Sequence, residues 1–209
     1  MNEFGINSTL EYQKEINMDN IFKQNFQINK SDYVLRNKHS SLVIWLTGLS
    51  GSGKSTIADE LNTYFFSQSI NSFILDGDNT RIGINSDLTF SDNDRKENIR
   101  RVAEISKLFN DAGFVIIASF ISPFQSDRDM AKQIIGVENY FEVFINCPIE
   151  ECEKRDVKGL YKKARNGEIQ KFTGIDSPFE EPQNPNLIIN TTKLSIKEAT
   201  KLIIDKINL

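Results

Sequence analysis

Residues 42–56 have the sequence Leu-Val-Ile-Trp-Leu-Thr-Gly-Leu-Ser-Gly-Ser-Gly-Lys-Ser-Thr. The apolar run 42–46 is typical of a buried strand, and residues 48–55 fit the pattern G-x-x-x-x-G-K-[ST] at every fixed position. Ile57, Ala58 and Leu61 then indicate a helix that packs on a sheet. Because strand, glycine-rich loop and helix follow in the order that this pattern requires, the stretch predicts a binding site for nucleotide phosphates.

The residue types of this loop suit an anion. Glycines can take positive φ angles, so that backbone N–H groups surround a phosphate at the start of a helix. Lys54 adds a mobile positive charge, and the Ser55 hydroxyl is a suitable ligand for a phosphate-bound Mg²⁺. The predicted nucleotide-binding residues are Gly48, Leu49, Ser50, Gly51, Ser52, Gly53, Lys54, Ser55 and Thr56.

Length and charge exclude several classes of protein. The 209 residues are enough for one α/β domain with a full core. The net charge of −4 argues against a general nucleic-acid binder, which needs a clustered basic excess. Since the chain has no run of about eighteen apolar residues and no signal-peptide pattern, we expect a cytoplasmic protein that does not bind membranes.

Continuous apolar runs alternate with helical patterns and predict five strands, at residues 42–46, 72–75, 114–119, 140–146 and 186–189. Such runs are typical of a parallel sheet that is covered by helices on both faces. The predicted fold class is α/β, a P-loop three-layer sandwich with a central five-stranded parallel sheet and a lid. We predict an N-terminal extension at 1–40 with a short helix, a P-loop domain at 41–209, and a lid at about 157–181. The extension can pack part of its length on the domain through the apolar residues Ile16, Ile21, Phe22 and Phe26. Residues 195–198 match a capping box ahead of a closing helix.

Acidic residues follow the predicted strand at 72–75. Asp76 and Asp78 lie at the sheet edge where α/β folds bind ligands, and Arg81 comes one turn later. Two carboxylates can orient a metal shell and accept a proton from an attacking hydroxyl, while an arginine can pair with an anion. The alternative is a solvated acidic turn, but carboxylates at this edge are costly without cations.

Two further polar clusters have both a functional and an ordinary explanation. Ser91 is a plausible N-cap, and Arg95 and Asn98 lie one turn apart on the helix that it begins, so both can face one ligand. Taken alone, a solvated helix face explains them better. The basic segment 158–165 can close over phosphates and exclude water, and its alternative is a solvated charge run.

Six strings in register resemble the adenylylsulfate kinase (APS kinase) family over about residues 20–209. They are GLSGSGKST at 48–56, DGDNTR at 76–81, FSDNDRKENIRR at 90–101, SFISP at 119–123, KGLYKKAR at 158–165 and FTGIDSPFE at 172–180. The resemblance implies transfer of the γ-phosphoryl group of ATP to the ribose 3′-hydroxyl of adenosine 5′-phosphosulfate (APS). The product would be 3′-phosphoadenosine 5′-phosphosulfate (PAPS), an intermediate of sulfate assimilation.

The resemblance also implies roles for individual residues. Asp78 would orient or deprotonate the 3′-hydroxyl, Lys54 and Ser55 would hold ATP and Mg²⁺, and Asp76 would lie near the metal. The implied substrate-binding residues are Asp78, the adenine stackers Phe90 and Phe172, the phosphosulfate ligands Arg81, Arg95 and Asn98, the pocket residues Ile121 and Ser122, and Lys158.

The family's usual description makes the serine of the SFISP string, here Ser122, a phosphoserine intermediate. Phosphoryl transfer depends mainly on positioning and charge neutralisation, so a direct in-line step is sufficient. We therefore expect Ser122 to line the pocket, with the covalent role as the alternative. The chain departs from common family residues at Thr80, Ile82, Asn146 and Gln170, all outside the phosphate loop, so we expect activity to be retained.

Rival functions remain open at this point. One is another small-molecule P-loop kinase, acting on a nucleoside or a sugar. The other is a GTP-dependent switch, because residues 29–32 (Asn-Lys-Ser-Asp) fit the guanine-reading pattern N-K-x-D, although they precede the phosphate loop and follow no buried strand. The family resemblance further implies a homodimer and a functional link to ATP sulfurylase.

Overall fold

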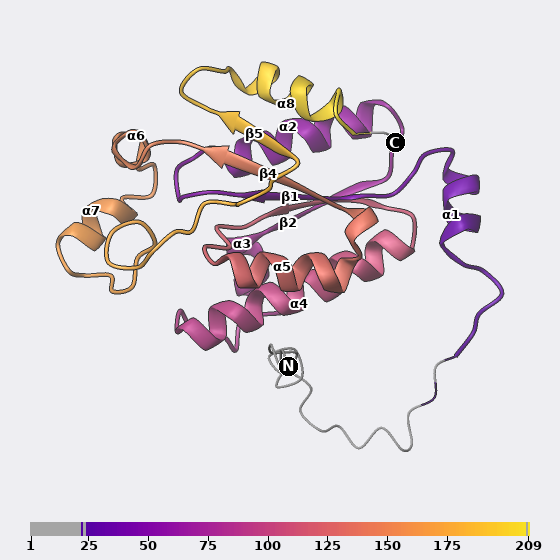
Figure 1. Cartoon of the computed structure of the whole chain (residues 1–209), viewed down its shortest axis with the longest axis horizontal. Helices are drawn as coiled ribbons and strands as arrows, with labels where there is room; N and C mark the ends of the chain where they lie inside the picture. The colour runs from indigo at the N-terminus through magenta and orange to yellow at the C-terminus, as the bar shows by residue number, and fades with distance from the viewer. Residues whose placement is uncertain (1–21, 23, 208) are drawn as a thin grey trace, which may run out of the picture.

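The computed structural model describes residue 22, residues 24–207 and residue 209. One sheet contains five strands in the order β2-β3-β1-β4-β5, and every neighbouring pair is parallel (Figure 1). The strands are β1 (Val43–Thr47), β2 (Ser72–Asp76), β3 (Val115–Ser119), β4 (Tyr140–Asn146) and β5 (Leu187–Asn190). The helices are α1 (Lys30–Asn37), α2 (Lys54–Ser67), α3 (Gly77–Ile82), α4 (Asp92–Asp111), α5 (Gln125–Ile135), the 3-10 helix η2 (Val137–Asn139), α6 (Ile149–Arg155), α7 (Leu160–Arg165) and α8 (Ile196–Ile204).

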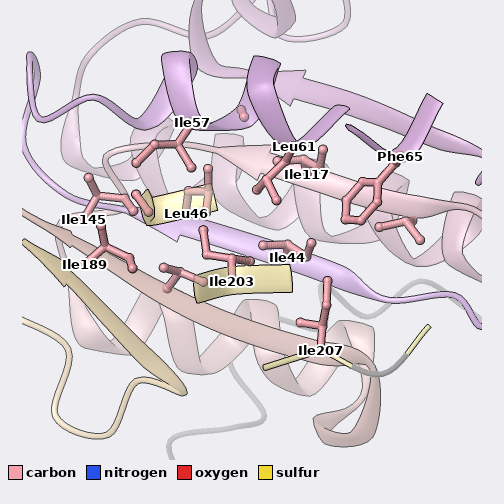
Figure 2. Close-up of a cluster of buried hydrophobic side chains, with 14 residues drawn as sticks. Ile44, Leu46, Ile57, Leu61, Phe65, Ile117, Ile145, Ile189, Ile203 and Ile207 are labelled. Carbon is pink, nitrogen blue, oxygen red and sulfur yellow. The ribbon is translucent and has the colours of Figure 1, made fainter. Parts of the chain in front are cut away.

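The central strand β1 explains why its sequence is apolar at every position. All its residues are buried, because helices cover both faces of the sheet. Ile44 and Leu46 pack toward α2 and α8, in the cluster shown in Figure 2. Val43 and Trp45 pack on the opposite face, in the cluster that includes residues of α4 and α5. The predicted α/β three-layer sandwich is confirmed.

The helix α8 closes the face of the sheet that α2 also covers. Its Ile203 lies in the same cluster as Leu61 and Phe65 of α2 (Figure 2). The helix begins with the predicted capping box, in which the Ser195 side chain accepts from the Glu198 N–H and the Glu198 carboxylate accepts from the Ser195 N–H. This face supports the helix that begins at the phosphate loop.

Two helices, α3 and α7, are absent from the sequence-based expectations. The first has six residues and starts with Asp76 as its N-cap, which is too short to show helical periodicity. The second lies in the predicted lid, and buries only Tyr161 and Ala164 within a run of basic residues. Local capping and long-range packing, rather than an apolar stripe, therefore define both helices.

The N-terminal region contains the short helix that was expected, at Lys30–Asn37. Phe22 and Phe26 were expected to pack on the domain, but both are exposed. The other apolar residues in that prediction, Ile16 and Ile21, lie outside the described residues. The helix itself is tied to the domain through Asn37, whose side-chain amide donates to Gly113 O at 3.2 Å. The boundary at residue 40 stays a prediction.

Within the described ranges, no helix is long and apolar enough to cross a membrane.

Candidate active site

The carboxyl ends of the strands meet at one edge of the sheet, where the predicted site residues gather. The phosphate loop follows β1, and α3 follows β2. Residues 120–124 follow β3, and α6 and α7 follow β4 (Figure 1). Parallel α/β sheets bind ligands at this edge, because the connecting loops open there.

The phosphate loop has the backbone conformation that its glycines allow. The φ angles of Gly51 and Gly53 are 73° and 105°, in the left-handed region. At Gly48 the neighbouring strand leaves no space for a side chain, since a Cβ atom would lie 2.4 Å from Ile145 O. The loop thus leads from a buried strand directly into the N-terminus of α2, where an anion is stabilised.

Lys54 is buried against the loop that it belongs to. Its Nζ donates to Gly48 O at 2.9 Å and to Leu49 O at 2.7 Å. Burial removes water from the ammonium group and lowers the pKa of Lys54 to about 8. A phosphate at the loop would provide a further negative charge close to this ammonium group.

Ser55 and Asp76 bring two side-chain oxygen atoms together at the start of α2. The Ser55 hydroxyl donates to Asp76 Oδ2 at 2.9 Å, and Asp76 Oδ1 accepts from the backbone N–H of Asp78 at 3.0 Å. Thr80, one of the departures from the family pattern, donates its hydroxyl to Asp76 O at 3.0 Å, whereas Ile82 is exposed. These two departures therefore leave the Ser55–Asp76 pair in place.

Asp78 forms an ion pair with Lys158 of the lid. Both side chains are accessible, with 67% and 63% of their surface exposed. The carboxylate raises the pKa of Lys158, chiefly through the side-chain hydrogen bond. The candidate base thus lies on the surface of the site, next to a lysine whose sequence position is 80 residues away.

Arg81 and Phe90 form one wall beside Asp78. The Arg81 guanidinium lies over the Phe90 ring, 4.3 Å from its centroid, and Nη1 donates to Thr89 O at 2.9 Å. Phe90 is 62% exposed, so its side chain is accessible to a planar ligand. Arg81 belongs to the same short helix as Asp78, which fixes the arginine and the candidate base relative to each other.

Arg95 connects the two loops that carry the predicted adenine stackers. Its Nε donates to Phe90 O at 3.0 Å, and its Nη1 donates to the Thr173 hydroxyl at 3.0 Å. Its Nη2 donates to Lys171 O, next to Phe172. Asn98 lies deeper, where its side-chain oxygen accepts from Asn85 at 3.0 Å. Sequence spacing allowed Arg95 and Asn98 to face one ligand but favoured a solvated helix face, which is wrong for the buried Asn98, and it gave no indication of the link across the site.

Ser122 is only 2% exposed, and its hydroxyl is engaged on two sides. Trp45 Nε1 donates to Ser122 Oγ at 3.1 Å, and Ser122 Oγ lies 3.0 Å from the Thr47 hydroxyl. The Thr47 hydroxyl in turn donates to Ile121 O at 2.7 Å. These contacts hold residues 121–122 against β1, and they use the hydroxyl that a phosphoserine would require.

Three residues that sequence reasoning left unassigned hold the site together. The Tyr161 hydroxyl donates to Ser50 O at 2.9 Å. Arg155 donates from Nη2 to Thr191 O at 3.0 Å and from Nη1 to carbonyl oxygens of the phosphate loop. The buried Arg128 donates to Ser122 O at 2.7 Å and pairs with Glu142 at 3.1 Å. Arg128 could have been noticed in the sequence, because it is a charged residue at a buried position of α5. No feature of the sequence indicates the roles of Tyr161 and Arg155.

The guanine-reading pattern at residues 29–32 has a structural use. Asn29 is the N-cap of α1 and forms a capping box with Asp32. Lys30 Nζ donates to the side-chain oxygens of Asn110 and Asn139 at 2.5 and 2.6 Å. Figure 1 places α1 at the end of the sheet opposite the phosphate loop, so this pattern does not read a base there.

Comparison with known proteins decides between the remaining alternatives. Residues 40–190 match the model of the adenylylsulphate kinase family. The chain belongs to the adenylylsulfate kinase family. The adenylyl-sulfate kinase of Bacillus pumilus is 54% identical over 85% of this chain and 90% of its own length. That of Geotalea uraniireducens is 51% identical over 88% of this chain and 89% of its own length.

Solved structures agree with this family assignment. The adenylylsulfate kinase of Mycobacterium tuberculosis, in complex with AMPPNP and APS, superposes with a TM-score of 0.78. It is 43% identical and aligns over 80% of this chain and 98% of that chain. A gluconokinase from Sinorhizobium meliloti has a TM-score of 0.52 at 14% identity, which shows a shared fold alone. The sugar-kinase and switch alternatives therefore lose their support.

Proposed function

We propose that this adenylylsulfate kinase transfers the γ-phosphoryl group of ATP to the 3′-hydroxyl of APS and so makes PAPS for sulfate assimilation. One observation carries the proposal. Asp78 is connected to both halves of the site, the nucleotide half (the phosphate loop, Lys54, Ser55 and Asp76) and the acceptor half: its backbone N–H donates to Asp76 Oδ1 at 3.0 Å, and it shares α3 with Arg81, whose guanidinium lies over the Phe90 ring. A donor phosphate and an acceptor hydroxyl can therefore meet at one carboxylate.

Asp78 is the proposed catalytic base. When the 3′-oxygen bonds to the γ-phosphorus and the bond from that phosphorus to the β-phosphate oxygen breaks, the hydroxyl proton passes to the Asp78 carboxylate. In the structure this carboxylate is paired with Lys158. APS must share or displace that contact, which would free Lys158 for the phosphosulfate group. General-base positioning of this kind contributes about 10²- to 10⁴-fold to rate.

The nucleotide half supplies charge for the transferred group. Lys54 exchanges its contacts with Gly48 O and Leu49 O for the β- and γ-phosphates, with backbone N–H groups of residues 48–56 around them. The neighbouring oxygens of Ser55 and Asp76, 2.9 Å apart, fit Mg²⁺, which prefers oxygen ligands and few protein side chains. Bound there with ATP, Mg²⁺ would neutralise charge on the phosphates.

The acceptor half is proposed to hold APS by stacking and charge. Phe90 and Phe172 stack on the adenine, and Arg81, Arg95 and Asn98 hold the phosphosulfate end. These roles are supported by Arg95, which donates hydrogen bonds to the backbone of the loops that carry Phe90 and Phe172. Ile121 and Ser122 line the pocket as a rigid wall. Because the Ser122 hydroxyl is buried and hydrogen-bonded, we propose direct transfer without a phosphoserine.

The assembly and the metabolic link stay predictions. We propose a homodimer, which light scattering coupled to gel filtration would test: a mass of one chain would contradict it. A functional link to ATP sulfurylase would appear as faster PAPS formation when that enzyme supplies APS, compared with the same amount of added APS.

A panel of acceptors tests the proposed function. Purified protein with Mg·ATP is given APS, AMP, adenosine or gluconate, and ADP release is followed while the nucleotide product is identified. We expect release with APS, matched one-to-one by PAPS phosphorylated at the 3′ position. Equal ADP release without APS, or preference for another acceptor, would overturn the proposal.

A further inference from the structure

Tyr161 of α7 contacts the nucleotide half and the acceptor half at the same time. Its hydroxyl donates to Ser50 O of the phosphate loop at 2.9 Å. Its ring meets the Phe172 ring edge to face, with centroids 5.0 Å apart and an interplanar angle of 75°. The residue is only 2% exposed. One buried side chain therefore joins a loop proposed to bind ATP to a ring proposed to stack on APS.

The packing around Tyr161 is close enough to transmit movement. Leu49 of the phosphate loop and Ile175 of the lid belong to the same apolar cluster as Tyr161 and Phe172. Gly174 lies between Phe172 and Ile175 in the sequence. It approaches the phosphate loop so closely that a Cβ atom there would lie 3.0 Å from a methyl carbon of Leu49. Since well-packed contacts of this kind resist independent motion, a shift of the lid must alter the phosphate loop.

The backbone and the hydroxyl of Tyr161 are both held. Asp156 accepts from the N–H groups of Tyr161 and Lys162, each at 3.1 Å, and so fixes the start of α7. Burial raises the pKa of the Tyr161 hydroxyl, which keeps it protonated as a donor to Ser50 O at neutral pH. The Tyr161 ring is the part of this residue that contacts the acceptor half, through Phe172.

We propose that Tyr161 is a positioning residue that couples occupancy of the APS site to order in the phosphate loop. The inference rests on the proposed function, because it takes Phe172 as an adenine stacker. Adenine on Phe172 restrains that ring, the restrained ring fixes Tyr161, and Tyr161 fixes Ser50. ATP then has less disorder to remove from the loop, so each ligand tightens binding of the other.

The test compares AMPPNP binding with and without saturating APS by calorimetry, using the full chain. Tyr161→Phe removes only the hydroxyl, and Tyr64→Phe, on the outer surface of α2, is the matched control. In wild type and Tyr64→Phe, APS should tighten AMPPNP binding by about fivefold or more, within the usual range of coupling. In Tyr161→Phe the gain should fall below about twofold. A gain in Tyr161→Phe equal to that of wild type would overturn the proposal.

A second measurement needs no variant. In the wild-type chain, APS added without nucleotide should slow hydrogen exchange of the amides at residues 50–53, and unchanged exchange would also overturn the proposal. Failure of the proposed function is distinguishable, because the wild type would then make no PAPS. Normal PAPS formation together with uncoupled binding would reject the role of Tyr161 alone.

Discussion

The two halves of the site are built in different ways. The nucleotide half follows a buried strand, and its phosphate loop is formed by backbone together with local side-chain contacts of Lys54 and Ser55 within residues 48–76. The acceptor half consists of accessible side chains such as Phe90 and Lys158, held by hydrogen bonds between segments about 76 to 80 residues apart. A contiguous motif thus specifies where phosphate binds, whereas long-range contacts arrange the group that receives it. Substitutions should therefore separate ATP binding from acceptor chemistry.

The largest separation is expected at Asp78. Asp78→Asn keeps the shape of the site but removes the proposed base, so turnover should fall by roughly two or more orders of magnitude. ATP affinity should change less than about threefold, because the contacts of Lys54 and Ser55 remain. Steady-state kinetics and calorimetry check both values. Asp111→Asn, at the far end of α4, is the control, and unchanged turnover in Asp78→Asn would reject the base.

The nucleotide half can be disturbed alone through pH. Lys54 has a pKa lowered to about 8 by burial, so the free enzyme loses this proton above pH 8. Phosphate binds the protonated form, and ATP affinity should therefore fall by up to about tenfold for each pH unit above 8. Calorimetry without APS checks this, together with proton uptake on binding. Lys54→Arg stays charged and should show no such decline; the same decline in that variant would assign it to another group.

The acceptor half can be weakened alone through Asp176. Its carboxylate accepts from the backbone N–H groups of Lys171 and Phe172, and these hydrogen bonds lower its pKa. Asp176→Asn replaces one acceptor oxygen by an amide group, so the Phe172 loop should be held less well. We expect the KM for APS to rise about three- to tenfold with a clearly smaller rise of the KM for ATP. An equal rise of both KM values would contradict this prediction, and would mean that Asp176 stabilises the nucleotide half as much as the acceptor half.

The smallest effect on rate is expected at Ser122. Ser122→Ala removes the acceptor of the Trp45 N–H, which should lower the free energy of unfolding by about 1–3 kcal/mol, while turnover changes less than about threefold. Thermal unfolding and steady-state kinetics measure the two effects. Loss of turnover by orders of magnitude in a folded variant would contradict this prediction and would support a covalent role for Ser122.

The difference between the halves also explains what the sequence predicts. The phosphate loop, the N-caps Ser91 and Ser195 and the five strands are defined by neighbours in the chain, and the structure confirms them, although the edge strands β2 and β5 each bury only one residue. The contact of Tyr161 with Ser50 spans 111 residues, and nothing near either residue indicates it. The helix α7 is hidden for the same reason, because its stability comes from that contact and from packing. Long-range tertiary contacts are the part that local pattern cannot supply.

The central claim is that ATP and APS bind side by side at the carboxyl edge of the sheet, and that ATP transfers its γ-phosphoryl group to APS in one step. The most direct test uses an ATP analogue whose γ-phosphorus is chiral, because it carries one sulfur atom and different oxygen isotopes. After reaction with APS, ³¹P NMR gives the position and the configuration of the transferred group. A single in-line displacement predicts a 3′ product with inverted configuration. Retention would mean two displacements through an enzyme-bound intermediate, and would contradict the account.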